Sequence, residues 1–70
     1  MLDAGTRVRI RKDALALQDA DFRARVDELR VAVVEKGDKC HGWVFLVFPK
    51  IGRKREFRAG WFDPRSLEIV

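Results

Sequence analysis

Cys40 and His41 are the one place in the sequence where a nucleophile stands directly beside a base. Nucleophilic catalysis requires the base within hydrogen-bond reach of the nucleophile, and a further group that orients the base. Adjacent residues in a turn usually point apart, and the sequence identifies no orienting acid for His41. We therefore interpret the pair as turn residues and predict no catalytic residue. The single cysteine and single histidine also predict neither a metal site nor a cofactor.

A run of basic residues is the second candidate site, because residues 50–58 carry five positive charges and one negative charge. Gly52 within the run predicts a hairpin tip. Cations on a protruding hairpin reach the phosphates of a nucleic acid and release counterions there. A solvated tip that only maintains solubility is the alternative, and the sequence leaves both open. The candidate nucleic-acid-binding residues are Lys50, Arg53, Lys54, Arg55 and Arg58.

The apolar segment from Trp43 to Phe48 must position these candidates, because its six consecutive apolar residues lie between Gly42 and Pro49. This pattern predicts a strand that is buried on both faces. The face that we expect to form the core contains Val44, Leu46 and Phe48. The other face contains Trp43, Phe45 and Val47. Since an apolar face that the chain leaves uncovered is typical of an interaction surface, the candidate partner-binding residues are Trp43, Phe45, Val47 and Phe62.

Two strands are predicted before this segment. Residues 6–12 alternate strictly, which predicts a strand with Val8 and Ile10 facing the core. β-Branched residues predict a strand over residues 29–35, which we expect to pair with the central strand as an antiparallel hairpin.

Two strands are predicted after it. Residues 56–62 return from the basic tip, and residues 67–70 form a short last strand after a turn at residues 63–66. We expect Leu67 and Ile69 to point inward. Alternation places Phe57, Ala59 and Trp61 on one face of the return strand, and Glu56, Arg58, Gly60 and Phe62 on the other.

The acidic segment of residues 13–28 predicts a short helix from Asp19 to Glu28, capped by Asp19 or Asp21. The alternative is a long irregular excursion. If the helix covers the second face of the central strand through Phe22 and Val26, the protein is a monomer; otherwise that face binds a partner or a second copy, and we favour self-association. The same acidic segment is expected to pair with the outward row of Arg7, Arg9 and Arg11.

Length and composition predict one mainly β domain over residues 1–70, since a chain this short forms one core. Fifteen Lys and Arg residues against 11 Asp and Glu residues give a net charge of +4, which permits a nucleic-acid partner without requiring one. The lone cysteine fits a reducing compartment. The N-terminus lacks the pattern of a signal peptide and no segment is long and apolar enough to span a bilayer, so we expect a cytoplasmic protein with no membrane partner.

The ends of the chain resemble the SH3-like small β-barrel. Residues 59–70, Ala-Gly-Trp-Phe-Asp-Pro-Arg-Ser-Leu-Glu-Ile-Val, are similar to the strand, 3₁₀ turn and closing strand that end this fold. Gly5 to Ile10 resembles the opening G-x-x-V-x-V strand of bacterial SH3-like domains. The resemblance implies a five-stranded SH3-like barrel with a short helix in the first long connection. Trp43 stands where peptide-binding SH3 domains place a groove tryptophan, although this chain has no tyrosine.

The resemblance implies non-catalytic binding, and we expect a protein partner or a homo-oligomer, with nucleic-acid binding by the basic tip as the alternative. The ends are also similar to the plasmid-type dihydrofolate reductase, a tetrameric SH3-like barrel. That enzyme depends on a Val-Gln-Ile-Tyr stretch, and residues 57–62 read Phe-Arg-Ala-Gly-Trp-Phe instead. The small oligomeric enzyme is therefore the third and weakest hypothesis.

Overall fold

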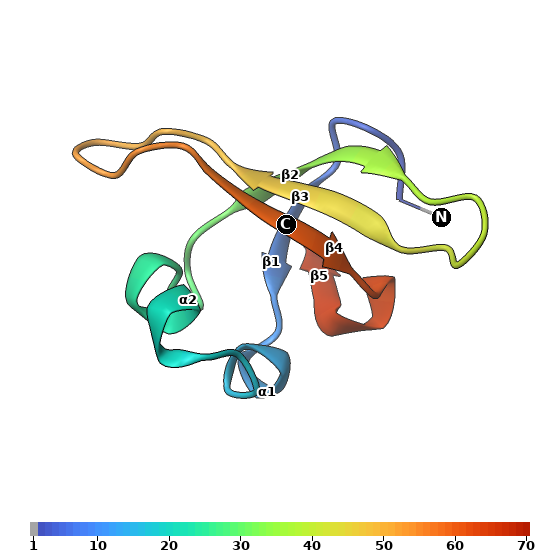
Figure 1. The fold of residues 1–70 in the computed structure, drawn as a ribbon. Coiled ribbons are helices and arrows are strands. Elements are labelled where there is room, and N and C mark those ends of the chain that lie inside the picture. The colour runs from blue at the N-terminus through green and yellow to red at the C-terminus, as the bar shows by residue number, and fades with distance from the viewer. Residues whose placement is uncertain (1) are drawn as a thin grey trace.

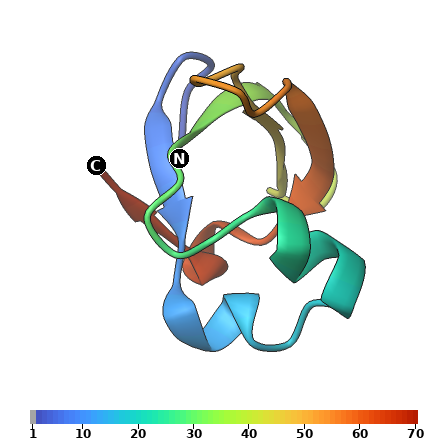
Figure 2. The ribbon, with the colours of Figure 1, turned by 90° about the vertical axis from the view of Figure 1, so that its left-hand side faces the viewer.

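The computed structural model describes residues 2–70, which contain a five-stranded antiparallel sheet and two short helices (Figure 1). The strands follow one another in the sheet in the order β4-β3-β2-β1-β5. Figure 2 shows the strands curving around the core, with both helices at one end. Neither helix is long and apolar enough to cross a membrane. The elements are β1 (Arg7–Ile10), α1 (Lys12–Leu15), α2 (Ala20–Arg25), β2 (Ala32–Gly37), β3 (Val44–Phe48), β4 (Phe57–Phe62), the 3₁₀ turn η1 (Pro64–Ser66) and β5 (Leu67–Ile69).

The central strand β3 has one buried face, as predicted. Val44, Leu46 and Phe48 are at most 1% exposed and lie in the core. The opposite face differs from the prediction that both faces are buried. Trp43, which precedes the strand, is 44% exposed, and Phe45 and Val47 are partly exposed. We call this side of β3 and its neighbours the outer face of the sheet.

The return strand β4 contains a β-bulge that overturns its predicted faces. Leu46 pairs with Gly60 and Val47 pairs with Arg58, so Ala59 is an extra residue without a partner on β3. Gly60 has φ of +109°, which residues with a side chain rarely adopt. Phe57 and Phe62 therefore both contact the core side, whereas Arg58 and Trp61 pair with outer-face residues. Strict alternation had grouped Phe57 with Trp61, which is wrong.

The first connection forms two short helices instead of the single helix predicted from Asp19 to Glu28. The helix α2 begins after Asp19, whose carboxylate accepts a hydrogen bond from the Phe22 N–H at 2.8 Å, so the predicted cap is confirmed. It ends at Arg25 because the backbone at Val26 is extended. The helix α1 was not predicted, since its four residues are too few to show a period.

The helix α2 covers the inner side of the sheet and leaves the outer face open. The ring of Phe22 lies 5.6 Å from that of Phe57 and 5.8 Å from that of Phe62, and Val26 is 1% exposed within the core. Of the two alternatives left open by the sequence, the one in which the helix covers the second face of β3 is therefore wrong. Because the core incorporates Phe22 and Val26, the outer face of β3 receives no helix.

Three smaller predictions need correction. The second strand runs over Ala32–Gly37 and begins three residues later than expected. Ile69 is 68% exposed, whereas Leu67 is buried as predicted. Arg11 pairs with Asp13 of the acidic segment at 3.5 Å, but Arg9 pairs with Glu68 of β5 at 3.7 Å instead.

Candidate functional site

The turn between β2 and β3 contains Cys40 and His41, and it shows no catalytic arrangement. The Asp38 carboxylate accepts the Cys40 N–H at 2.8 Å and contacts His41 Nδ1 at 3.0 Å. The hydrogen bond from the Cys40 N–H lowers the pKa of Asp38 most, and the hydrogen bond with His41 lowers it further. Within residues 2–70 no hydrogen bond joins the Cys40 thiol to the imidazole. Asp38 is thus an acid beside His41 that sequence reasoning did not identify, and the thiol stands exposed without a base.

The outer face carries a cluster of rings and cations that we call the outer aromatic surface. Phe45 and Trp61 are cross-strand neighbours, with ring centroids 5.4 Å apart and planes at 83°. The Lys36 ammonium lies 5.6 Å from the centroid of Phe45 and 5.8 Å from that of Trp61. Trp61 remains 42% exposed. The surface consists of Lys36, Phe45, Arg58 and Trp61, to which we add Trp43, the residue before β3, whose ring lies 6.4 Å from that of His41.

Arg58 crosses the outer aromatic surface from one side of β3 to the other. It begins on β4, passes its guanidinium 4.9 Å from the centroid of Phe45, and pairs with Glu35 of β2 at 2.8 Å. The hydrogen bond to Glu35 raises the pKa of Arg58 further. Phe45 is therefore covered by two cations, Lys36 and Arg58, while Trp43 and Trp61 remain 44% and 42% exposed.

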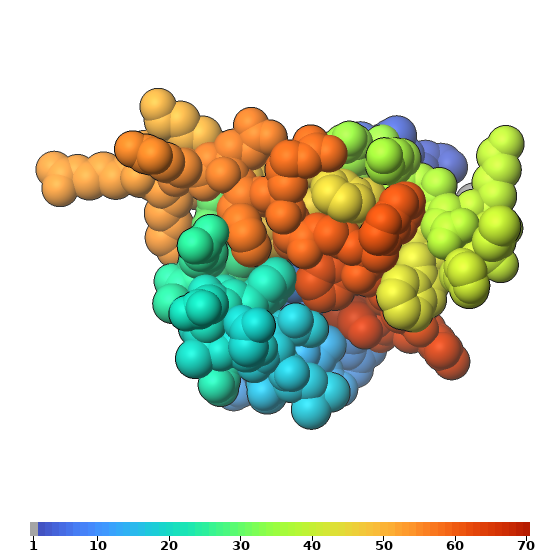
Figure 3. Space-filling model, viewed as in Figure 1, coloured from blue at the N-terminus to red at the C-terminus, as the bar shows by residue number. Residues whose placement is uncertain are grey.

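The basic residues form a hairpin tip, as the sequence predicted. Ile51 and Lys54 exchange backbone hydrogen bonds of 3.0 and 2.9 Å around Gly52, whose φ is +56°. The tip projects beyond the sheet, away from the β2 and β3 turn (Figure 1). Figure 3 shows the tip in orange and the outer side chains of β3 and β4 on the same view of the molecule.

The structure brings four of the predicted nucleic-acid-binding residues together on the tip, and places Arg58 on the adjoining outer aromatic surface. Lys54 is not free, because it pairs with Asp27 at 3.5 Å. Of the predicted partner-binding residues, Trp43, Phe45 and Val47 lie on the outer face. Phe62 is 9% exposed and belongs to the core, so it is not a surface residue.

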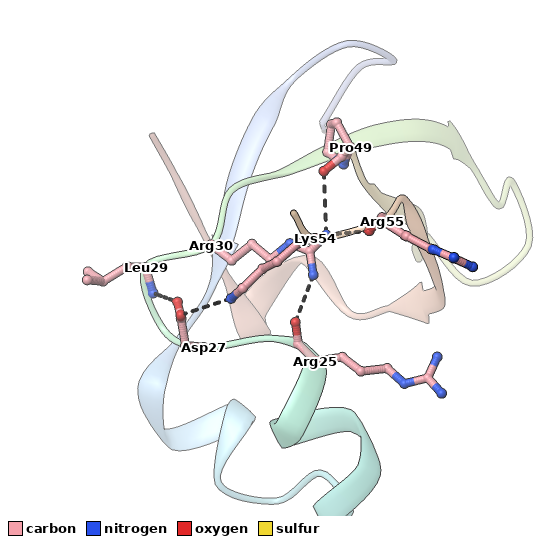
Figure 4. A network of polar contacts seen from close by, with 7 residues as sticks. All are labelled: Arg25, Asp27, Leu29, Arg30, Pro49, Lys54 and Arg55. Carbon is pink, nitrogen blue, oxygen red and sulfur yellow. Dashed lines mark hydrogen bonds and ion pairs between the residues drawn. The ribbon is translucent and has the colours of Figure 1, made fainter. Parts of the chain in front are cut away.

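Arg30 is the most buried charged residue of the described chain, at 8% exposed, and sequence reasoning missed it. Figure 4 shows its guanidinium donating to three backbone carbonyls from three separate segments. The acceptors are Arg25 at 2.7 Å, Arg55 at 2.9 Å and Pro49 at 3.4 Å. No carboxylate of residues 2–70 forms an ion pair with Arg30. The guanidinium therefore ties the end of α2 to the base of the basic tip.

Asp27 lies beside this network and pairs with the tip. Its carboxylate accepts the Leu29 N–H at 2.9 Å and contacts Lys54. The Leu29 hydrogen bond is the largest cause of a lowered pKa of Asp27; partial burial opposes it, and the charge of Lys54 assists it. Asp27 thus joins the segment after α2 to Lys54 of the basic tip.

The described residues contain no group of three side chains suited to hold a metal ion. Comparison with protein-family models, with curated proteins and with solved structures gives no match. The functional argument therefore depends on the surfaces of this chain alone.

Proposed function

We propose that this protein is a non-catalytic binding module that binds single-stranded nucleic acid through the outer aromatic surface and the basic tip. The observation that carries the proposal is that partly exposed rings and cations from three adjacent strands, β2, β3 and β4, lie together on the outer face. Trp43 and Trp61 are 44% and 42% exposed. Stacking of a base on such a ring contributes about 1–3 kcal/mol, and neighbouring cations contact the backbone phosphates.

The placement of Lys36 and Arg58 favours a polyanion over an apolar partner. Both cations lie over Phe45, and among residues 2–70 Arg58 forms an ion pair with Glu35 alone. The centre of a protein interface is depleted in lysine, because burying its charge there costs solvation, whereas arginine and aromatic residues are enriched, so Lys36 carries this preference. A phosphate backbone compensates the same cations and leaves the tryptophan rings available to the bases.

We also propose the SH3-like barrel as the finer architecture. Three features support it: the sheet order β4-β3-β2-β1-β5, the helices within the first long connection, and the 3₁₀ turn η1 directly before the short β5. The strand curvature seen in Figure 2 is the shape that such a barrel requires.

Titration of a fluorescent oligo(dT) with the protein, read by anisotropy at several salt concentrations, tests the nucleic-acid function. Each phosphate contact contributes a slope of about 0.7 to the fall of log affinity with log salt. Arg53→Glu should weaken binding and flatten this slope. Trp61→Ala should weaken binding at every salt concentration, because it removes stacking instead of charge.

Lys12→Glu is the matched control, since it makes the same charge change at an exposed residue of α1. It should bind more tightly than Arg53→Glu. Equal losses for Lys12→Glu and Arg53→Glu would show that only net charge matters. An unchanged affinity in both Trp61→Ala and Arg53→Glu would reject the proposed surface.

Self-association through the outer face is the second candidate, favoured by the exposure of Trp43 and the partial exposure of Val47. It predicts a mass that rises with concentration in light scattering and falls to the monomer in Val47→Glu. A monomeric mass at all concentrations rejects it, and the oligo(dT) titration remains independent of that outcome.

A further inference from the structure

A small cleft lies between α2 and the base of the basic tip, apart from the outer aromatic surface. Its volume is about 260 Å³. Four cationic residues and one acidic residue line it. Besides Ala24, the residues that line this cleft are Arg25, Arg30, Lys54, Arg55, Glu56 and Phe57.

The arginines of the cleft are not neutralised by carboxylates. No ion pair within residues 2–70 involves Arg25, Arg30 or Arg55, whereas Lys54 already pairs with Asp27. Arg30 is the buried arginine of the cleft. It is 8% exposed, and its Nε has no hydrogen-bond partner among the described residues. The described lining of the cleft therefore contains three arginines without an ion-pair partner and one acidic residue, Glu56.

The two exposed arginines of the cleft, Arg25 and Arg55, are available to contact a bound group. Arg25 lies over the ring of Phe57, with its guanidinium carbon 5.3 Å from the centroid. Figure 4 shows the side chains of Arg25 and Arg55 extending to the same side of the Arg30 network. Guanidinium groups bind phosphate oxygens in pairs with good geometry, so this arrangement suits a tetrahedral oxyanion.

We infer that this cleft binds a phosphate monoester, and that its occupant is the terminal phosphate of a nucleic-acid strand. The volume is below the range of about 300–1,000 Å³ that drug-sized ligands occupy, which favours a small group. A monoester carries a charge of about −1.5 to −2 at pH 7, whereas a diester within the strand carries one negative charge. The excess of cations over acids in the cleft therefore favours the terminal phosphate of a nucleic-acid strand over an internal diester.

The position of the cleft connects it to the proposed function, on which the choice of occupant rests. Phe57 lines the cleft, and the next residue, Arg58, belongs to the outer aromatic surface. Since β4 is at one end of the strand order, no other β-strand of the described residues lies between the two sites. A nucleic-acid strand whose end is bound in the cleft can therefore continue around the β4 edge of the sheet onto the exposed rings.

The test compares oligo(dT) with a 5′-phosphate and with a 5′-hydroxyl, in the wild-type protein and in Arg25→Gln. The wild type should bind the phosphorylated strand about tenfold more tightly, as expected for one or two charge-assisted hydrogen bonds. Arg25→Gln should remove most of this preference and leave the affinity for the hydroxyl strand within about twofold. Arg23→Gln, with the same charge loss on the same helix but outside the cleft, should retain the preference.

Inorganic phosphate provides an arm that does not depend on strand binding. Added to the ¹⁵N-labelled protein, it should shift the amide signals of Arg25, Arg55 and Phe57, and these shifts should vanish in Arg25→Gln. If both strands bind equally and phosphate shifts none of these signals, the cleft proposal is overturned while the nucleic-acid function stands. If neither strand binds but phosphate shifts them, the nucleic-acid function fails and the cleft is a site for free phosphate.

Discussion

Arg30 lies over the ring of Phe48, with its guanidinium carbon 5.3 Å from the ring centroid. Phe48 is fully buried at the end of β3, and the same guanidinium reaches carbonyl groups of α2 and of both strands of the basic tip. The interaction places a permanent charge at the boundary of the core. It also makes the position of the tip depend on a residue from a different part of the chain.

Arg30→Met should lower the free energy of unfolding by about 2–4 kcal/mol, because it leaves three buried or partly buried carbonyls without their charged donor. Urea denaturation with an unchanged m-value measures the loss. Arg53→Met at the exposed tip is the control and should change stability by less than about 0.5 kcal/mol. Equal stability of the two variants would show that the carbonyls find other donors.

Gly60→Ala should destabilise the protein by roughly 1–3 kcal/mol, since φ of +109° is strained for any residue with a Cβ. The added methyl meets no atom within 4 Å, so the cost comes from the backbone and not from a clash. Gly37→Ala is the matched control, because Gly37 is not among the positive-φ glycines. Thermal unfolding should rank Gly37→Ala above Gly60→Ala, and the reverse order would contradict the strain at the bulge.

Asp19→Ala should cost about 1 kcal/mol by removing the acceptor for the Phe22 N–H at the start of α2. Asp19→Asn keeps an acceptor and should restore most of this stability. Asp21→Ala, in the first turn but without a capping bond, should cost less. If Asp19→Ala and Asp21→Ala lose the same amount, the carboxylate acts through its charge and not as a cap.

The pKa of Asp27 should rise in Lys54→Ala but stay below the ordinary value of 3.8. The hydrogen bond from Leu29 is the largest cause of the lowered pKa, and this variant keeps it. Because the pKa of Asp27 is lower in the folded state, its carboxylate stabilises the protein at any pH above the unfolded-state pKa. This contribution is lost as the pH falls through the folded-state pKa. An NMR titration of the Asp27 carboxyl carbon between pH 2 and 6 measures the change. Lys50→Ala is the control, and an unchanged pKa in Lys54→Ala would show that the ion pair does not persist in solution.

The sequence predicted the strands where a period of two was locally intact. Val44, Leu46 and Phe48 alternate with outer residues, and burial requires that pattern. The same rule failed at Ala59, because a bulge changes the phase of the strand through pairing with β3, which composition does not reveal.

The candidate site was predictable only in part, for a related reason. The basic tip is a contiguous run and was visible from charge alone. Arg30 stands between Leu29 and Val31 and resembles an ordinary cation within a strand, yet its acceptors Pro49 and Arg55 are 19 and 25 residues away. Contacts of that separation depend on the tertiary fold, so neither the network nor the cleft beside it follows from local pattern.

The unpaired residue in β4 has a consequence for the behaviour of the protein at high concentration. A chain without Ala59 would keep the same residues inside and outside, because Phe57, Gly60 and Phe62 would then alternate regularly with Arg58 and Trp61. It would lose the bend that the bulge gives to β4, which lies at one edge of the sheet. A straight, unpaired edge strand is a template on which other chains can add strands and form fibrils. We therefore expect the bulge at Ala59 to reduce aggregation, although it requires the positive φ of Gly60 beside it.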